Sequence, residues 1–447
     1  MFSNEWVMPN IQTMCWIIPE GIELPTILKK YPPDFKYKID YFYYIIDTIS
    51  EATDFEDIDN NEGFVNLQGN RLQEFNHQYK KYIKYLQWRL IRRDKYIPGK
   101  KSFGYCLSFK NDSRGLVEIP IVDFVVRKKI KKEYAGKQQD SVSTEENYKY
   151  LTKWFNKHLN IDGIEARKKV DELFPPLTGA IRGKIKGQPS RTTKRYKSLV
   201  AIKKFELHEF YYNVDDNIGR FHSNIANIKK ELRSFITYNG HRLVNIDIKN
   251  SQPLFSQLLL NSTFYENNPD YINIYQFQTA IQLIGNNNIN RIINNIRYNI
   301  MIVESDVNQS GIAFSNYIDL VNSGDFYRGI SNLIAPNLPY EKSLMKTMMF
   351  LVFFSHNRFI GQPEAKTKLA FKNYFPEVYQ IFRLLKTTNH TVLSHILQRI
   401  ESLVIVEKAA KRIAFENPFL PIFTVHDSIA TIVGNEDYVE NPRKLTP

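Results

Sequence analysis

A chain of 447 residues is long enough for two or three domains, because a single hydrophobic core stops growing at roughly 250 to 300 residues. The chain carries 60 Lys and Arg against 47 Asp and Glu, a formal net charge of +13 that favours a polyanionic partner. Its 43% of hydrophobic residues can form a sizeable core, which excludes a disordered protein.

Cysteine usage and hydropathy bear on where the protein works. The 2 cysteines, Cys15 and Cys106, exclude a disulfide framework and a Cys-x-x-Cys zinc site and favour a reducing compartment. The longest purely apolar run, 348–354, has seven residues, whereas a membrane span needs about 20. The N-terminus shows no basic region followed by an apolar run. We therefore expect no membrane partner and an intracellular protein, either cytoplasmic or encoded by a virus or mobile element.

The first 140 residues predict an α+β domain, with nucleic-acid binding as one interpretation. Apolar residues recur at helical spacing over 64–90, which predicts a pair of helices. Residues 91–109 place Pro98 and Gly99 between two β-prone runs, which predicts a basic hairpin. Helices followed by a basic hairpin resemble a winged helix, although many other α+β surfaces carry such a hairpin. A polar segment around residue 140 predicts the end of this domain, 1–140.

Residues 141–205 predict a helical region with a basic loop. Apolar periodicity over 144–175 indicates two helices. The stretch 182–204 contains nine Lys and Arg and no acid, and its glycines and proline predict a loop. Because a solvated loop normally mixes its charges, we expect a surface that follows a phosphate backbone. The candidate contacts are Arg191, Lys194 and Arg195.

Residues 242–248 predict a β-strand that contains an acid, Asp247. A carboxylate within an apolar strand is costly to desolvate, so such a group usually holds a cation or pairs with Lys or Arg. The alternative is that Asp247 caps a helix over 253–260. Asn250 and Ser251 are better placed for that capping role.

Residues 420–433 predict two strands joined by a turn that contains His426 and Asp427. A carboxylate at a hairpin tip, opposite a strand that carries another, suits two hard cations. Mg²⁺ takes one or two carboxylates and completes its shell with water and phosphate oxygens. The alternative is an ordinary turn, because aspartate is common in turns.

Residues 342–357 predict a helix with a stripe of two lysines and two phenylalanines. The four side chains, Lys342, Lys346, Phe350 and Phe354, are spaced four residues apart, so they follow one face of the helix. Two ammonium groups followed by two aromatic rings match a triphosphate followed by a sugar and a base. An amphipathic helix with its phenylalanines in the core is the alternative, but it does not explain why both residue types share a face.

In this order, the strand with Asp247, the helix with the Lys/Phe stripe and the hairpin with His426-Asp427 resemble the three polymerase motifs of the family A DNA polymerases. The single-subunit phage RNA polymerases share these motifs, and the resemblance covers roughly residues 206–434. The segment 219–223, Gly-Arg-Phe-His-Ser, is similar to the family's segment that touches the primer-template. Gln398 matches a glutamine that faces the duplex minor groove in the family.

This resemblance implies an α+β fold in the form of a right hand. A palm with an antiparallel sheet and helical fingers would occupy 206–447, and a thumb-like region would occupy 141–205. Asp247 and Asp427 would hold two Mg²⁺ ions, with Mn²⁺ as an alternative, and Lys346 would act with them in catalysis. The residues expected to bind the nucleotide are Lys342, Lys346, Phe350, Phe354 and Gln252. The residues expected to bind nucleic acid are Arg220, His222, Gln398 and His426.

The chain also departs from the family in ways that bear on its substrate. Gln252 stands where the DNA enzymes have a glutamate that helps to exclude ribose, and Ser428 follows Asp427 as in the RNA enzymes. We therefore predict a template-directed DNA polymerase without a proofreading exonuclease, acting on a DNA primer-template and nucleoside triphosphates. An RNA polymerase or primase on the same palm is one alternative, and a non-catalytic replication initiator or regulator is another. An accessory protein is a further partner to consider.

Overall fold

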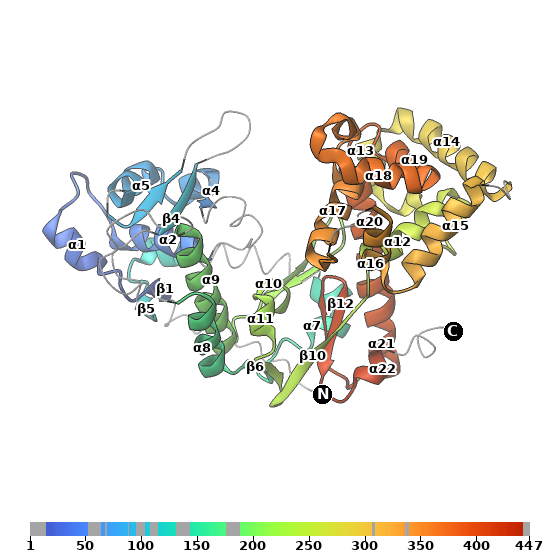
Figure 1. Ribbon diagram of the computed structural model, residues 1–447. Helices are drawn as coiled ribbons and strands as arrows, with labels where there is room; N and C mark the ends of the chain where they lie inside the picture. Colours follow the sequence, from blue (N-terminus) through green and yellow to red (C-terminus); the bar gives the residue numbers. More distant parts are fainter. Residues whose placement is uncertain are drawn as a thin grey trace. The chain divides into compact units, whose positions relative to one another are not determined.

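The computed structural model describes residues 15–51, 64–67, 69–87, 89–94, 103–107, 115–130, 144–175, 188–305, 309–334, 336 and 339–440. Within these ranges it combines helices with antiparallel sheets, so the α+β class expected from the sequence is confirmed. The chain forms two compact units (Figure 1). The first unit comprises Met1–Asn213, Ser223–Val244 and Thr431–Gly434, and the second comprises Val214–His222, Asn245–Ala430 and Asn435–Pro447.

The first unit contains helices and small antiparallel sheets. Its helices include α1 (Leu24–Lys30), α2 (Ile39–Glu51), α4 (Gly69–Phe75), α5 (Tyr79–Gln87), α7 (Lys149–Thr152), α8 (Gly163–Leu173), α9 (Gln188–Glu206), α10 (Asn224–Asn227) and α11 (Lys230–Arg233). Its strands include β1 (Cys15–Pro19), β2 (Val65–Asn66), β3 (Ile91–Arg93), β4 (Gly104–Leu107), β5 (Leu116–Pro120), β6 (Leu159–Ile161) and β9 (Ile236–Tyr238). β1 pairs with β5, β4 lies between β2 and β3, and β6 pairs with β9.

Several elements predicted for the N-terminal half are present in this unit. α4 and α5 are the predicted pair of helices, and β3 pairs with β4 as the predicted hairpin, with Arg92 opposite Cys106. Pro98, Gly99 and the boundary predicted near residue 140 lie outside the described residues. Between the helices predicted over 144–175 the structure adds the short strand β6, which the helical pattern of the sequence concealed.

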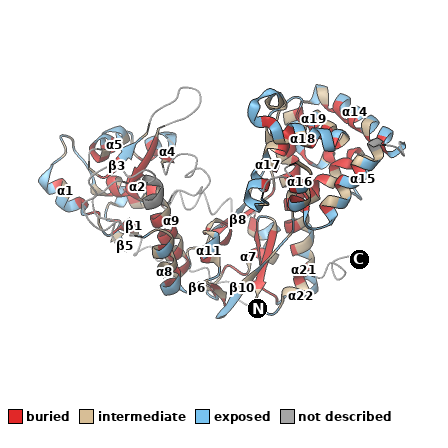
Figure 2. Cartoon of the chain, viewed as in Figure 1, coloured by how far each residue is buried: buried red, intermediate tan, exposed pale blue. Residues whose placement is uncertain are grey.

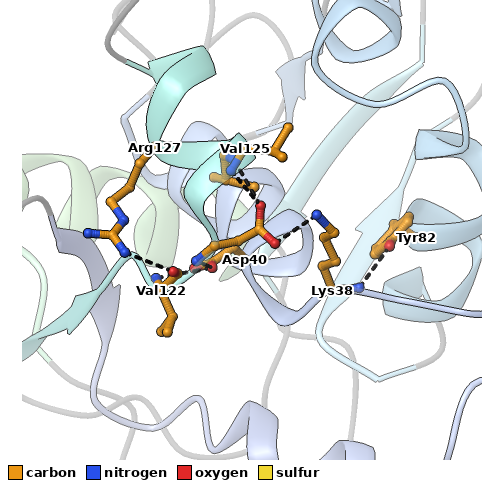
Figure 3. Close-up of polar contacts among 8 residues, drawn as sticks. Lys38, Asp40, Tyr82, Val122, Val125 and Arg127 are labelled. Carbon is orange, nitrogen blue, oxygen red and sulfur yellow. Dashed lines mark hydrogen bonds and ion pairs between the residues drawn. The ribbon is translucent and has the colours of Figure 1, made fainter.

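A buried carboxylate joins separate parts of the first unit (Figure 3). Asp40 of α2 is 2% exposed and accepts hydrogen bonds from the backbone N–H groups of Val122 at 3.2 Å and Asp123 at 2.7 Å. Trp16 Nε1 on β1 donates to the same carboxylate at 2.8 Å. Lys38 forms an ion pair with Asp123 at 2.7 Å. These bonds compensate the buried charge of Asp40 and fix β1 and the segment after β5 to α2.

The second unit is mainly helical. Its α-helices include α12 (Ser251–Ser256), α13 (Gln278–Ile284), α14 (Asn286–Ser305), α15 (Gln309–Asn322), α16 (Phe326–Ile334), α17 (Lys342–Phe354), α18 (Lys366–Tyr374), α19 (Pro376–Leu385), α20 (Val392–Ser402), α21 (Lys411–Glu416) and α22 (Glu436–Glu440). Short 3₁₀ turns lie at Gln257–Leu260, Ser262–Tyr265, Ile274–Gln276, Asn357–Gly361 and Pro363–Ala365. A π-helical segment, Leu403–Ala410, joins α20 to α21.

The core of the second unit lies between these helices, which are buried on one side and exposed on the other (Figure 2). α14 is rich in Asn and Ile; its Ile289, Ile293, Ile296 and Ile300 are buried at helical spacing, and most of its asparagines are exposed. The longest apolar run, 348–354, lies within α17 and contributes to this core. Among the helices that the structure describes, none combines the length and hydropathy needed to cross a membrane.

Four strands contribute residues to both units. β10 (His241–Asp247) pairs antiparallel with β9 in the first unit, with His241 opposite Tyr238. In the second unit β11 (Ile422–Val425), β12 (Ser428–Ile432) and the end of β10 follow one another in the order β11-β12-β10. The hairpin of β7 (Tyr212–Val214) and β8 (Phe221–Ser223) has its tip, Val214–His222, in the second unit. The second unit therefore contains the end of the predicted acidic strand and the predicted His-Asp turn.

Candidate active site

Asp247 is the last residue of β10, so the predicted acidic strand is present. Its side chain is exposed, and the expected cost of burying a carboxylate within an apolar strand does not arise. The reason is that no residue of β10 is buried; its apolar residues are only half-buried. Asn245 Nδ2 donates a hydrogen bond to Asp247 Oδ1 at 2.5 Å. This amide holds one carboxylate oxygen, and no described residue binds the other.

His426 and Asp427 form the two-residue turn between β11 and β12, as predicted. His426 has a φ of 55°, in the left-handed region that favours glycine. Asp427 is half-buried, and its carbonyl oxygen accepts a hydrogen bond from the N–H of Ile248 at 3.2 Å. Because Ile248 directly follows Asp247, this bond brings the backbone of the His-Asp turn next to the end of β10 that carries Asp247.

The residues at the start of α12 do not act as the predicted helix caps. Asn250 is the N-cap residue, but its φ is 54° and its side chain makes no capping bond, because capping requires a more extended backbone. The hydroxyl of Ser251 instead donates to Asp427 Oδ2 at 2.6 Å. The capping alternative is therefore not observed for this segment, and Ser251 orients the carboxylate of the His-Asp turn.

Neither aspartate forms an ion pair with Lys or Arg within the described ranges. Each has one neutral donor, Asn245 for Asp247 and Ser251 for Asp427, so no Lys or Arg of the described segments pairs with either carboxylate. Carboxylate oxygens with uncompensated charge are the ligands that Mg²⁺ prefers, and the donor set fits that ion. In the part of the chain that the structure describes, no group of three or more His, Cys, Asp or Glu is placed to hold a metal.

The Lys/Phe stripe lies on α17 with the spacing predicted. Lys342, Lys346 and Phe350 are exposed and Phe354 is half-buried, whereas the next residue back along the chain, Phe353, is in the core. The Lys346 Nζ lies 5.8 Å from the centroid of the Phe350 ring, and the Phe350 and Phe354 rings are 5.6 Å apart. The amphipathic alternative, with these phenylalanines in the core, fails for Phe350, which is 39% exposed, but holds in part for Phe354, which packs against the core.

Two lysines from neighbouring helices bind the C-terminal end of α17. Lys386 Nζ donates to the carbonyl oxygens of Val352 at 2.9 Å and Phe353 at 3.0 Å. Lys368 Nζ donates to the carbonyl oxygen of His356 at 2.7 Å. Burial lowers the pKa of Lys386 to about 7 and that of Lys368 to about 8. Because positive charge at a helix C-terminus is favourable, these ammonium groups fix the end of the helix that carries the stripe.

A glutamate that the sequence did not single out joins two predicted site residues. Glu401 on α20 has a side chain that is 3% exposed. Its Oε1 accepts from Arg220 Nη2 at 2.7 Å and its Oε2 accepts from Gln252 Nε2 at 2.6 Å. Burial raises the pKa of Glu401, and Arg220 opposes that rise. One feature of the sequence could have indicated this buried acid, because Glu401 lies between the apolar residues Ile400 and Leu403 in a helix with an apolar face.

The remaining predicted contacts of the second unit lie on β8 and α20. His222 on β8 and Gln398 on α20 are both half-buried. Gly219, before Arg220, has a φ of 69°, and a Cβ at this position would collide with the guanidinium of Arg399. Glycine is therefore favoured at this position by its backbone conformation, and a larger residue would also displace the Arg399 side chain.

The basic loop predicted within 182–204 is wrong for the residues described, because α9 begins at Gln188. Pro189 stands in the first helical turn, where a missing N–H is tolerated, so it starts a helix instead of breaking one. Arg195 is 0% exposed and its Nη2 lies 2.7 Å from Asp171 Oδ1. It is therefore part of the interior of the first unit. Lys194 is half-buried, and the side chain of Arg191 lies outside the described residues.

Comparison with known proteins gives no family for this chain. No family model, no curated protein and no solved structure matches it. The site therefore consists of Asp247 at the end of β10, Asp427 in the adjoining turn, the Lys/Phe stripe on α17 and a buried glutamate between Arg220 and Gln252.

Proposed function

We propose that this protein is a nucleotidyltransferase, a template-directed DNA polymerase without a proofreading exonuclease. The proposal includes a palm on the β11-β12-β10 sheet and fingers formed by the helices around α17. The observation that carries it is the backbone hydrogen bond that joins Asp427 to Ile248, the residue after Asp247, together with the lack of a basic partner for either aspartate among the described residues. The order of the motifs along the chain, which resembles the family A enzymes, supports the same reaction.

The two aspartates are the residues that would hold Mg²⁺. Bound there, the ions would make the primer 3′-hydroxyl a better nucleophile and neutralise charge on the triphosphate. Asn245 and Ser251 each donate to one carboxylate and so fix the direction of its oxygens. The protein therefore contributes mainly positioning and charge stabilisation, as is usual in phosphoryl transfer.

The exposed stripe of α17 would bind the incoming nucleotide. Lys342 and Lys346 would contact the phosphates, since neither forms an ion pair within the described residues and both are exposed. Phe350 and Phe354 would pack against the sugar and base. The Phe350 ring is accessible on the same face, one turn further along the helix.

The nucleic-acid substrate would contact residues from three other elements. Arg220 and His222 come from the β7–β8 hairpin, Gln398 comes from α20, and His426 comes from the His-Asp turn. By the resemblance these residues would hold the primer terminus and the minor groove of the primer-template. The net charge of +13 favours association with such a polyanion.

The test is extension of a labelled primer on a template with Mg²⁺ and either dNTPs or rNTPs. We expect extension with dNTPs by the unaltered chain and a loss of at least about 10³-fold in Asp427→Asn, because one charged carboxylate of the pair is removed. Asp437→Asn removes an exposed acid on α22 and serves as the control. Extension by Asp427→Asn at the rate of the unaltered chain contradicts the assigned site.

Ser428 and Gln252 favour the second candidate, an RNA polymerase or primase. Preferential extension with rNTPs would establish this activity in place of the first. No extension with either nucleotide, combined with duplex binding, would instead point to the non-catalytic initiator or regulator.

A further inference from the structure

Glu401 is the most deeply buried acid among the polar residues around the candidate site. It lies on α20, where Ile396, Leu397 and Ile400 are fully buried, and its own residue exposure is 2%. A carboxylate in such a place is retained only when hydrogen bonds and a counter-charge compensate its desolvation. Arg220 supplies the counter-charge, and Gln252 supplies the second hydrogen bond.

The bond to Gln252 fixes the orientation of its side-chain amide. An ionised carboxylate only accepts hydrogen bonds, so the NH₂ group of Gln252 must face Glu401 and the amide oxygen must face away. The amide oxygen, Oε1, is buried and has no hydrogen-bond partner among the described residues. Arg220 is held in the same way, with Nη2 on Glu401 and with a buried Nε that no described residue binds. Within the described ranges, each residue therefore has one buried, unsatisfied polar atom beside the atom that Glu401 binds.

This cluster lies beside the candidate catalytic carboxylate. Gln252 directly follows Ser251, whose hydroxyl binds Asp427 at 2.6 Å. The negative charge of Asp427 also acts on Glu401, adding to the effect of burial in raising its pKa. The start of α12 thus connects the two acids, through Ser251 to one and through Gln252 to the other.

We propose that Glu401 is a positioning residue that sets the amide orientation of Gln252 for the incoming nucleotide and holds Arg220 for the primer-template. This inference rests on the proposed polymerase function, because it assigns the two bound side chains to nucleotide and nucleic acid. A single buried carboxylate couples the two substrates, since both side chains depend on it for their orientation. Glu401 itself does not touch the reacting atoms.

The experiment measures the nucleotide KM and kcat in primer extension for the unaltered chain, Glu401→Gln, Gln252→Ala and the double variant. Glu401→Gln keeps the volume of the side chain but removes the charge that fixes the amide. We expect each single variant to raise the nucleotide KM about tenfold, the size of one lost hydrogen bond to a charged group, with a smaller change in kcat. The double variant should show no further increase, because Glu401 acts on the nucleotide through Gln252.

Glu416→Gln is the matched control. Glu416 accepts from Arg412 at 2.8 Å on α21, a partly exposed pair whose loss should leave the nucleotide KM unchanged. Circular dichroism and the melting temperature show whether Glu401→Gln folds, and Gln252→Ala tests the same amide without altering the buried acid. An unchanged nucleotide KM in folded Glu401→Gln overturns the inference, and so do single-variant effects that multiply in the double variant. If the unaltered chain extends no primer, the proposed function fails and this inference fails with it.

Discussion

α9 and α17 are both helices that carry several positive charges, and they place those charges in opposite environments. On α9, Arg195 is completely buried and pairs with Asp171, in a stretch where every residue from Arg195 to Val200 is buried. On α17, Lys342 and Lys346 are exposed to solvent, beside the buried residues of the same helix. The number of basic residues therefore says little about binding. Their spacing relative to the buried face decides whether they stabilise the fold or remain available to a ligand.

The largest effect that we expect from this comparison is on stability. Arg195→Met removes a buried guanidinium and leaves Asp171 without its partner, which should lower the free energy of unfolding by about 3 kcal/mol. Urea denaturation followed by circular dichroism measures this change. Lys168→Met on α8 is the control, because Lys168 pairs with Glu165 in an exposed position, where a pair contributes about 0 to 1 kcal/mol. If Arg195→Met and Lys168→Met had equal free energies of unfolding, the burial of Arg195 would not make it more important for stability than an exposed basic residue.

The next effect is on nucleotide affinity, without a change in stability. Lys346→Met should raise the nucleotide KM in primer extension about 10- to 100-fold, the range for a lost hydrogen bond to a charged group. Its unfolding free energy should stay within about 0.5 kcal/mol of the unaltered chain, because the side chain is exposed. Lys372→Met, an exposed lysine of α18 away from the stripe, should change neither quantity. A stability loss with an unchanged KM would show that Lys346 has a structural role like that of Arg195.

The elements that periodicity and turn chemistry determine were predictable from the sequence. The His426-Asp427 turn follows from two short β-prone runs, and the α17 stripe follows from a four-residue spacing that also leaves a separate apolar face. The α+β class follows from the same patterns. These features depend on neighbours along the chain, which a single sequence displays.

What depends on tertiary contacts was not predictable. The exposure of Asp247 reflects how little of β10 is covered, and the role of Ser251 reflects the approach of the His-Asp turn. Glu401 binds Arg220 and Gln252 from segments 181 and 149 residues away in the chain. Such partners have no local signal. The helix α9 was missed for another reason, since glycines and a proline near its start obscured its periodicity.

The smallest effect is on the pH dependence of stability, and it concerns Lys368 and Lys386 at the C-terminal end of α17. These lysines are buried, as Arg195 is, but they bind the helix that carries the stripe. In the folded chain the pKa of Lys386 is about 7 and that of Lys368 is about 8, against an ordinary value of 10.5. Above pH 7 the unfolded chain therefore binds more protons than the folded chain, so the free energy of unfolding rises with pH. The slope of the unfolding free energy against pH is set by the difference in bound protons between the two states, and Lys386 contributes less than one proton to it. Lys386→Met should therefore lower the slope between pH 7 and 9 by less than about 1.4 kcal/mol per pH unit.

Urea denaturation at several pH values in this window measures the slope, and Lys372→Met on the exposed face of α18 is the control. Lys386→Met also leaves the carbonyl oxygens of Val352 and Phe353 without their ammonium donor, which lowers stability at every pH. The difference in slope, not the offset, is therefore the informative quantity. An identical slope in both variants would mean that Lys386 is not held in a site that depresses its pKa, and that the end of α17 is fixed by other contacts.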